Sequence, residues 1–166
     1  MMKDVVLKAL NEQIHMELES AYTYLAMAAH FEDRSLPGFA GWMRQQAREE
    51  VAHAMRLFEH VVDRSGRVVL KAVAQPPQDF GGPLEAFTSA LEHEQKVTAS
   101  IHELYELTTR ERDFAAQVEL QWFVNEQVEE EKTATDIVDR LRLAGDNDAA
   151  LLLLDQQLGA RSVEAD

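Results

Sequence analysis

The segment from Gln46 to His53 reads Gln-Ala-Arg-Glu-Glu-Val-Ala-His and places polar residues where a core-facing helix should be apolar. Followed in steps of three and four, the stripe of this segment runs Phe39, Met43, Gln46, Glu50, His53, Leu57. Glu50 and His53 are three residues apart, so their side chains share one face of the predicted helix. A carboxylate on a core stripe is costly unless it is paired, so this interruption needs an explanation.

Three other segments carry the same interruption. Their stripes run Leu7, Leu10, Ile14, Glu17, Ala21, Tyr24, Ala28, Phe31; then Leu84, Phe87, Leu91, Glu94, Thr98, Ile101, Tyr105; then Ala116, Leu120, Phe123, Gln127, Glu130, Ala134, Ile137, Leu141. Each stripe is apolar at both ends and acidic in the middle. At ~1.5 Å per residue, Glu17, Glu50 and Glu94 each lie about 20 Å from a helix end. In an antiparallel bundle the four carboxylates therefore meet in one layer.

The spacing of turn residues predicts an all-α fold in a single domain over residues 1–166. The expected helices cover about residues 3–33, 37–65, 83–110, 113–145 and a short fifth at 149–158. Two short connections flank a long one, residues 67–83, which holds three of the four prolines. A crossover of this length makes the second and third helices parallel within a four-helix bundle. The run from Leu151 to Leu154 is apolar all round and suggests a subunit interface, and residues 161–166 are expected to be frayed.

Composition narrows the function classes. The chain has 166 residues, 46% of them hydrophobic, and a formal net charge of −14. This charge disfavours nucleic acid and anionic membranes as partners, because both require basic surface. The absence of cysteine excludes disulfides, zinc–thiolate sites and iron–sulfur clusters. No stretch has the length of a signal-peptide core or a membrane span, so a cytoplasmic location is expected.

Four buried carboxylates cannot share one layer without cations, and two divalent ions would balance their charge. Oxygen ligands with one imidazole suit iron or manganese. Glu50 is placed to bridge both ions, Glu17 and His53 to complete one shell, and Glu94 and Glu130 to complete the other.

Several neighbouring residues have two interpretations. Tyr24 is either a core tyrosine with a satisfied hydroxyl or an electron donor beside the ligands, and Gln127 either fills space or orients oxygen or a carboxylate. Glu49, Glu126 and Glu129 form either a third, looser metal site or a solvated acidic run. The remaining histidines are expected at the surface: His15, His30, His60, His93 and His102.

Three stretches together resemble the non-haem bacterial ferritins, and the resemblance covers nearly the whole chain. They are Gln46–His53, His93-Glu94-Gln95, and Gln121-Trp122-Phe123 continuing through Glu126–Lys132. The resemblance implies a ferritin-like bundle that assembles as a shell of 24 subunits. It also implies oxidation of ferrous iron by dioxygen or hydrogen peroxide, and storage of a hydrated ferric oxide.

The resemblance also assigns residues, in agreement with the stripes. It implies a first iron site of Glu17, Glu50 and His53; a second of Glu50, Glu94 and Glu130 beside Gln127; a third of Glu49, Glu126, Glu129 and Glu130; and Tyr24 next to the centre. Bacterioferritins carry a second Glu-x-x-His, but here the fourth segment reads Gln127-Val128-Glu129-Glu130. Their haem-ligating methionine is Val51 here, so no haem is expected.

Other relatives and other functions fit less well. Rubrerythrins need cysteines, and the mini-ferritins that protect DNA lack the fifth helix. A di-iron or di-manganese oxidase acting on an organic substrate remains an alternative on the same scaffold. So do a non-catalytic assembly that buffers metal and a purely structural bundle. The oxidant, the iron routes and the reductase partner are left open by the sequence.

Overall fold

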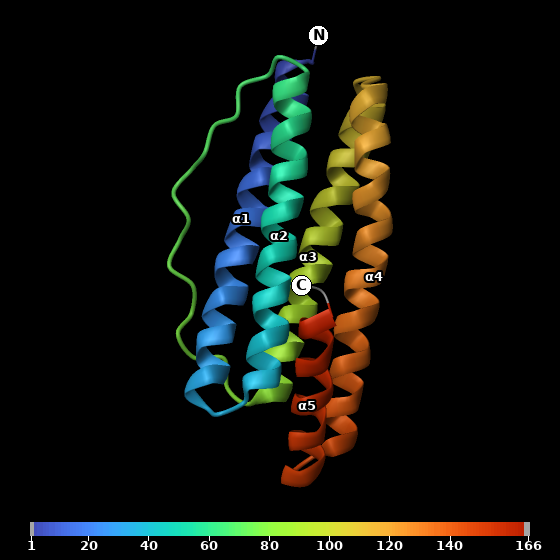
Figure 1. The fold of residues 1–166 in the computed structure, drawn as a ribbon. Helices are drawn as coiled ribbons and strands as arrows, with labels where there is room; N and C mark the ends of the chain where they lie inside the picture. The colour runs from blue at the N-terminus through green and yellow to red at the C-terminus, as the bar shows by residue number, and fades with distance from the viewer. Residues whose placement is uncertain (1, 165–166) are drawn as a thin grey trace.

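The computed structural model describes the backbone of residues 2–164 and the side chains of residues 2–160, and this part contains five helices and no strand (Figure 1). Their bounds are α1 Asp4–Asp33, α2 Pro37–Asp63, α3 Pro83–Arg110, α4 Phe114–Ala144 and α5 Asp148–Glu164. The predicted all-α bundle with one long crossover and a fifth helix is confirmed. No helix of the described part is long and apolar enough to cross a membrane.

The long connection sets the direction of the helices. It passes along the outer side of α1 for most of the length of the bundle, so that α2 and α3 run parallel (Figure 1). The two short turns each place one residue in the left-handed region, Ser35 with φ 57° and Arg112 with φ 55°. Pro37 and Pro83 occupy the first turns of α2 and α3, where a missing N–H is tolerated.

The crossover corrects one prediction. His30 is buried, although it was expected at the surface, because Phe80 and Gly81 at the end of the crossover cover it. Its Nε2 donates to the Gly81 carbonyl oxygen at 2.8 Å, and its Nδ1 accepts from Arg34 at 3.0 Å. Of the other histidines predicted at the surface, only His102 is exposed; the half-buried ones are His15, His60 and His93.

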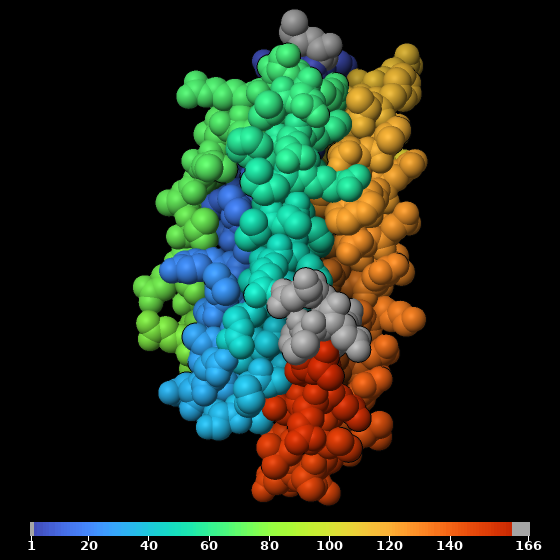
Figure 2. All heavy atoms as spheres, in the orientation of Figure 1, coloured from blue at the N-terminus to red at the C-terminus, as the bar shows by residue number. Residues whose placement is uncertain are grey.

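α5 is longer than predicted and docks closely on the start of α2. It begins after Asn147, whose Oδ1 accepts from Ala150 N at 3.0 Å, and its backbone continues to Glu164 instead of ending at 158. Residues 161–164, predicted to be frayed, are therefore helical, and residues 165–166 lie outside the described part. The space-filling view shows α5 projecting beyond the end of the other helices (Figure 2).

The contact of α5 with α2 depends on glycine. A Cβ on Gly38 would lie 1.7 Å from the carbonyl oxygen of Asp155, and Gly159 approaches the same glycine. The Asp155 carboxylate accepts from Phe39 N at 2.9 Å, so α5 supplies a capping group for the first turn of α2. Leu151 and Leu154 pack against the core, whereas the two leucines between them are more than half exposed.

The apolar core falls into two clusters, one at each end of the bundle. The polar residues predicted in the middle of each stripe lie between them. The predicted stripe of α3 is wrong at every second position. The predicted core residues at those positions are only half-buried: Leu84, Leu91, Thr98 and Tyr105. The residues buried in their place are Ala90, Val97 and Leu104. Both stripes share Phe87, Glu94 and Ile101, so the spacing of apolar residues alone does not choose between them.

Candidate metal centre

Six polar side chains from all four long helices meet between the two apolar clusters. None of them exposes more than 8% of its surface. They are Glu17 from α1, Glu50 and His53 from α2, Glu94 from α3, and Gln127 and Glu130 from α4. The structure therefore brings together the residues that the stripes place at one depth.

Glu17, Glu50 and His53 form a fully buried group of possible ligands. Each offers one ligand atom, and these three atoms lie within 4.8 Å of one another. Oε2 of Glu17 and Oε2 of Glu50 are buried and have no hydrogen-bond partner. No lysine or arginine is buried among the side chains that the structure describes. A divalent cation fits this donor set, because it would satisfy the unpartnered oxygens and balance their charge.

The environment favours protonated carboxyl groups while no cation is bound. Burial, reinforced by neighbouring carboxylates, raises the pKa of Glu17 and of Glu50 well above the usual range. Burial and the charge of Glu94 raise the pKa of Glu130 to about 7. A metal ion entering the layer must therefore displace protons from these groups.

These shifts predict that the metal-free protein loses stability as the pH rises. The Glu130 carboxyl has a pKa of about 7 in the folded state and 4.5 as the reference value. Its stabilising contribution is fully present below pH 4.5 and is lost as the pH rises through about 7. Thermal unfolding in chelator gives the free energy of unfolding of each protein at each pH. Over this pH interval, we expect the free energy of unfolding of Glu130→Gln to fall by on the order of 2 kcal/mol less than that of wild type. Identical pH profiles for the two proteins would contradict the assignment.

Glu94 is aligned by two neutral donors. The Tyr24 hydroxyl donates to its Oε1, and Gln127 Nε2 donates to its Oε2 at 3.2 Å. Burial and the nearby carboxylates raise the pKa of Tyr24, which keeps the phenol protonated as a donor. The charge of Glu94 raises the pKa of both Glu50 and Glu130, so Glu94 faces the same space even though it lies outside the group of Glu17, Glu50 and His53.

A second group of possible ligands adjoins the first. His53, Glu126 and Glu130 offer atoms within 4.8 Å of one another. Glu49 lies close enough for its charge to raise the pKa of Glu50 and Glu130, and its Oε1 accepts from Gln45 at 3.0 Å. Glu129 is exposed and belongs to neither group found among the described residues. The geometry thus places His53, rather than Glu129, beside Glu126 and Glu130.

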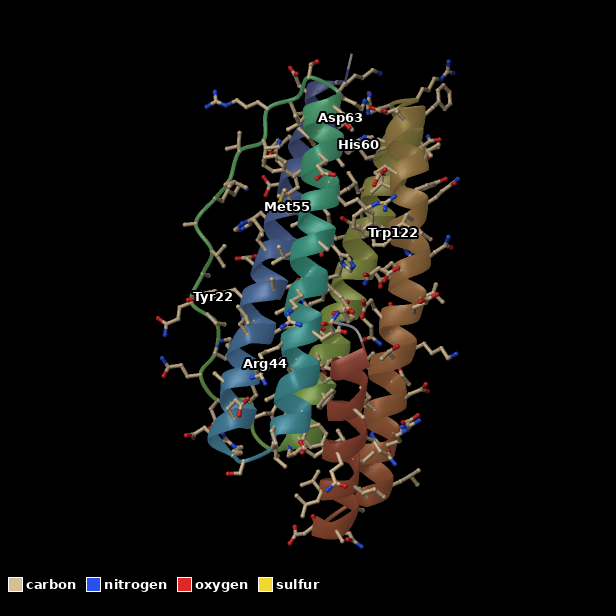
Figure 3. The ribbon with its side chains drawn as sticks, in the orientation of Figure 1. Tyr22, Arg44, Met55, His60, Asp63 and Trp122 are labelled. Carbon is tan, nitrogen blue, oxygen red and sulfur yellow. The ribbon has the colours of Figure 1, made fainter. Side chains whose placement is uncertain are left out.

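Three residues that contact the layer were not predicted to do so from the sequence. Gln46 was placed on its stripe without a role, and it donates to Glu130 Oε2 at 2.9 Å. Gln13 lies beside the α1 stripe rather than on it, so periodicity gave no signal for it. Trp122 lies on the side of α4 that faces α2 (Figure 3). The centroid of its ring is 5.3 Å from that of the His53 ring, and the Arg56 guanidinium lies over the Trp122 ring.

Comparison with known proteins places the chain among ferritins. Residues 7–144 match the Ferritin-like domain family. A bacterial non-heme ferritin of Bacteroides fragilis is 39% identical over 161 residues, which are 97% of this chain and 100% of the relative. One from Staphylococcus aureus is 37% identical and covers 99% of both chains. The crystal structure of an open pore ferritin from Archaeoglobus fulgidus has a TM-score of 0.95 and 50% identity, covering 96% of this chain and 98% of its own.

Proposed function

Because this chain belongs to the ferritin-like family, we propose that it oxidises ferrous iron in the buried carboxylate layer and stores the ferric product. One observation carries the proposal. Four carboxylates and one imidazole are buried at one depth with no buried lysine or arginine beside them, and two of the carboxylate oxygens lack a hydrogen-bond partner. A structural core gains nothing from this arrangement, whereas a pair of divalent cations requires it.

The donors divide between two ferrous ions. Glu17 and His53 complete the shell of the first ion, Glu94 and Glu130 that of the second, and Glu50 lies where it can bind both. Hard oxygen donors favour ferric over ferrous iron, which assists the loss of an electron. Tyr24 and Gln127 hold the Glu94 carboxylate in place while the charge on the metal changes.

The proposed reaction needs electrons, which the ferrous ions supply, and protons, which groups in the layer can supply. Each of two ferrous ions gives one electron to dioxygen, and two protons complete hydrogen peroxide. The carboxyl groups of Glu17 and Glu50 hold protons that entering ions displace, so a source of protons lies beside the reacting atoms. Hydrogen peroxide can replace dioxygen as the electron acceptor, and water is then the product.

Storage requires an assembly, which we propose is a shell of 24 copies of this chain. Large apolar side chains remain exposed on the single subunit. The most exposed are Leu143 at 88%, Phe114 at 71%, Val118 at 69%, Val128 at 67% and Leu70 at 63%. Interfaces between copies would cover them. The net charge of −14 favours attraction of ferrous ions to such a shell.

One experiment tests the function. Ferrous iron is added to the purified protein without air, air is admitted, and ferric absorbance and sedimentation are followed together. We expect oxidation well above the buffer rate and large particles that retain many irons per subunit. Oxidation at the buffer rate would refute the ferroxidase activity. Rapid oxidation with no more than three irons retained per subunit would refute storage.

The second group of ligands makes a separate prediction about a third ion. Glu126 lies beside His53 and Glu130, whereas Glu129 points to solvent. We therefore expect Glu126→Ala to lose the weakest of three ferrous ions in an anaerobic calorimetric titration, and Glu129→Ala to retain it. Loss of this ion in both variants would favour the ligand set implied by the family resemblance, which contains both glutamates, over the one that the geometry supports.

A further inference from the structure

Gln13 connects Ser100 to the metal layer through two hydrogen bonds. Its side chain is 2% exposed, and its Nε2 donates to Glu17 Oε1 at 2.8 Å. Its Oε1 accepts from the Ser100 hydroxyl of α3 at 2.6 Å. The second hydrogen on Nε2 is directed at the sulfur of Met16, 3.8 Å away. Every polar atom of this buried amide is thus in contact with a partner.

The Glu17 carboxylate favours one orientation of the amide. If the amide were flipped, its oxygen would face Glu17, and two acceptors would oppose each other whenever that carboxyl is ionised. In the observed orientation the amide N–H faces the carboxylate, and the Ser100 hydroxyl donates to the amide oxygen. Ser100, which is half-buried, therefore anchors Gln13 to α3 with its donor side toward the ligand.

The hydrogen bond occupies one oxygen of Glu17 and leaves the other free. Oε1 receives the amide, while Oε2 is the buried oxygen without a partner. We propose that Gln13, anchored by Ser100, is a positioning residue that holds Glu17 as a one-oxygen ligand of the first metal position. This inference deepens the proposed function and rests on it.

The other carboxylates of the layer show why the donor is an amide. Gln46 donates to Glu130, and Gln127 donates to Glu94. A lysine or arginine in any of these places would orient the carboxylate equally well but would also neutralise it and compete with the cation. A neutral amide fixes the direction of the carboxylate and leaves its full charge for the metal.

Anaerobic titration with cobalt(II) tests the proposal without relying on iron oxidation. Its ligand-field spectrum reports the coordination of each site, and calorimetry gives separate affinities. The variants are Gln13→Leu, which removes the donor, Ser100→Ala, which removes the anchoring hydroxyl, and Ser100→Thr, which retains it.

We expect Gln13→Leu to weaken one of two cobalt sites by about 10–100-fold, to change its spectrum and to leave the other site unchanged. Ser100→Ala should weaken the same site less, and Ser100→Thr should restore it. Wild-type affinities in both Gln13→Leu and Ser100→Ala would overturn the proposal, as would equal weakening of both sites together with a lower melting temperature.

The two proposals fail in different ways. Wild-type protein that binds two cobalt ions, shows this pattern in the variants and oxidises no iron would refute the ferroxidase activity alone. Rapid iron oxidation by wild type, with cobalt binding unaffected by Gln13→Leu, would refute the role of Gln13 alone. Wild-type protein that binds no cobalt in the layer would refute both proposals, because each requires metal ions there.

Discussion

Glu50→Gln is expected to lose rapid iron oxidation almost completely while the protein stays folded. Glu50 lies in the fully buried group of ligands, and it interacts electrostatically with Glu94 and Glu130 as well as with Glu17. An amide of the same shape can offer only one neutral oxygen, so both metal positions are weakened at once. The loss should exceed the ~10–100-fold that follows removal of a residue that merely supports a ligand.

The same change should not harm the metal-free fold. Burial raises the pKa of Glu50, so a neutral glutamine resembles the protonated carboxyl that the empty layer favours. Initial rates of iron oxidation and melting temperatures in chelator should be compared for wild type, Glu50→Gln and Glu59→Gln, an exposed change on the same helix. Oxidation by Glu50→Gln at the rate of the Glu59→Gln control would move the reaction to another part of the molecule.

The depth of the layer could be predicted from the sequence because helical geometry converts residue number directly into height. Glu17, Glu50 and Glu94 are placed at the correct depth for this reason, and His53 follows from Glu50 by one helical turn. The rotation of a helix about its own axis does not follow from residue number in the same way. In α3 two stripes pass through Glu94, and the packing of Ala90 and Val97 against neighbouring helices decides between them.

The donors around the ligands depend on contacts between helices, which spacing along one helix does not encode. Gln13 has a role only because Ser100, 87 residues away, meets it across the bundle. His30 was assigned to the surface because the path of the crossover over α1 could not be read from its composition. The fifth helix was predicted to end at residue 158, but α5 continues through Gly159, whose lack of a side chain allows α5 to approach Gly38.

Gly38→Ala is expected to cause the largest structural change of any single methyl group added to this chain. The new Cβ would lie 1.7 Å from the backbone carbonyl oxygen of Asp155, and a backbone atom cannot move aside as the end of a side chain can. α5 must then separate from α2, which breaks the hydrogen bond from Phe39 N to Asp155 and uncovers Leu151 and Leu154. The cost should be at least the ~1–3 kcal/mol typical of overpacking.

Separation of α5 from α2 should affect storage of iron but not its oxidation. The ligands lie on α1 to α4, so iron oxidation per subunit should persist in Gly38→Ala, whereas assembly and ferric loading should fall. Sedimentation and limited proteolysis within residues 145–164 measure these effects. Asp155→Asn, which retains the Oδ1 acceptor, is the matched control and should behave nearly as wild type. A fully assembled Gly38→Ala protein with a protease-resistant α5 would show that the close contact between Gly38 and Asp155 is not needed to hold this helix.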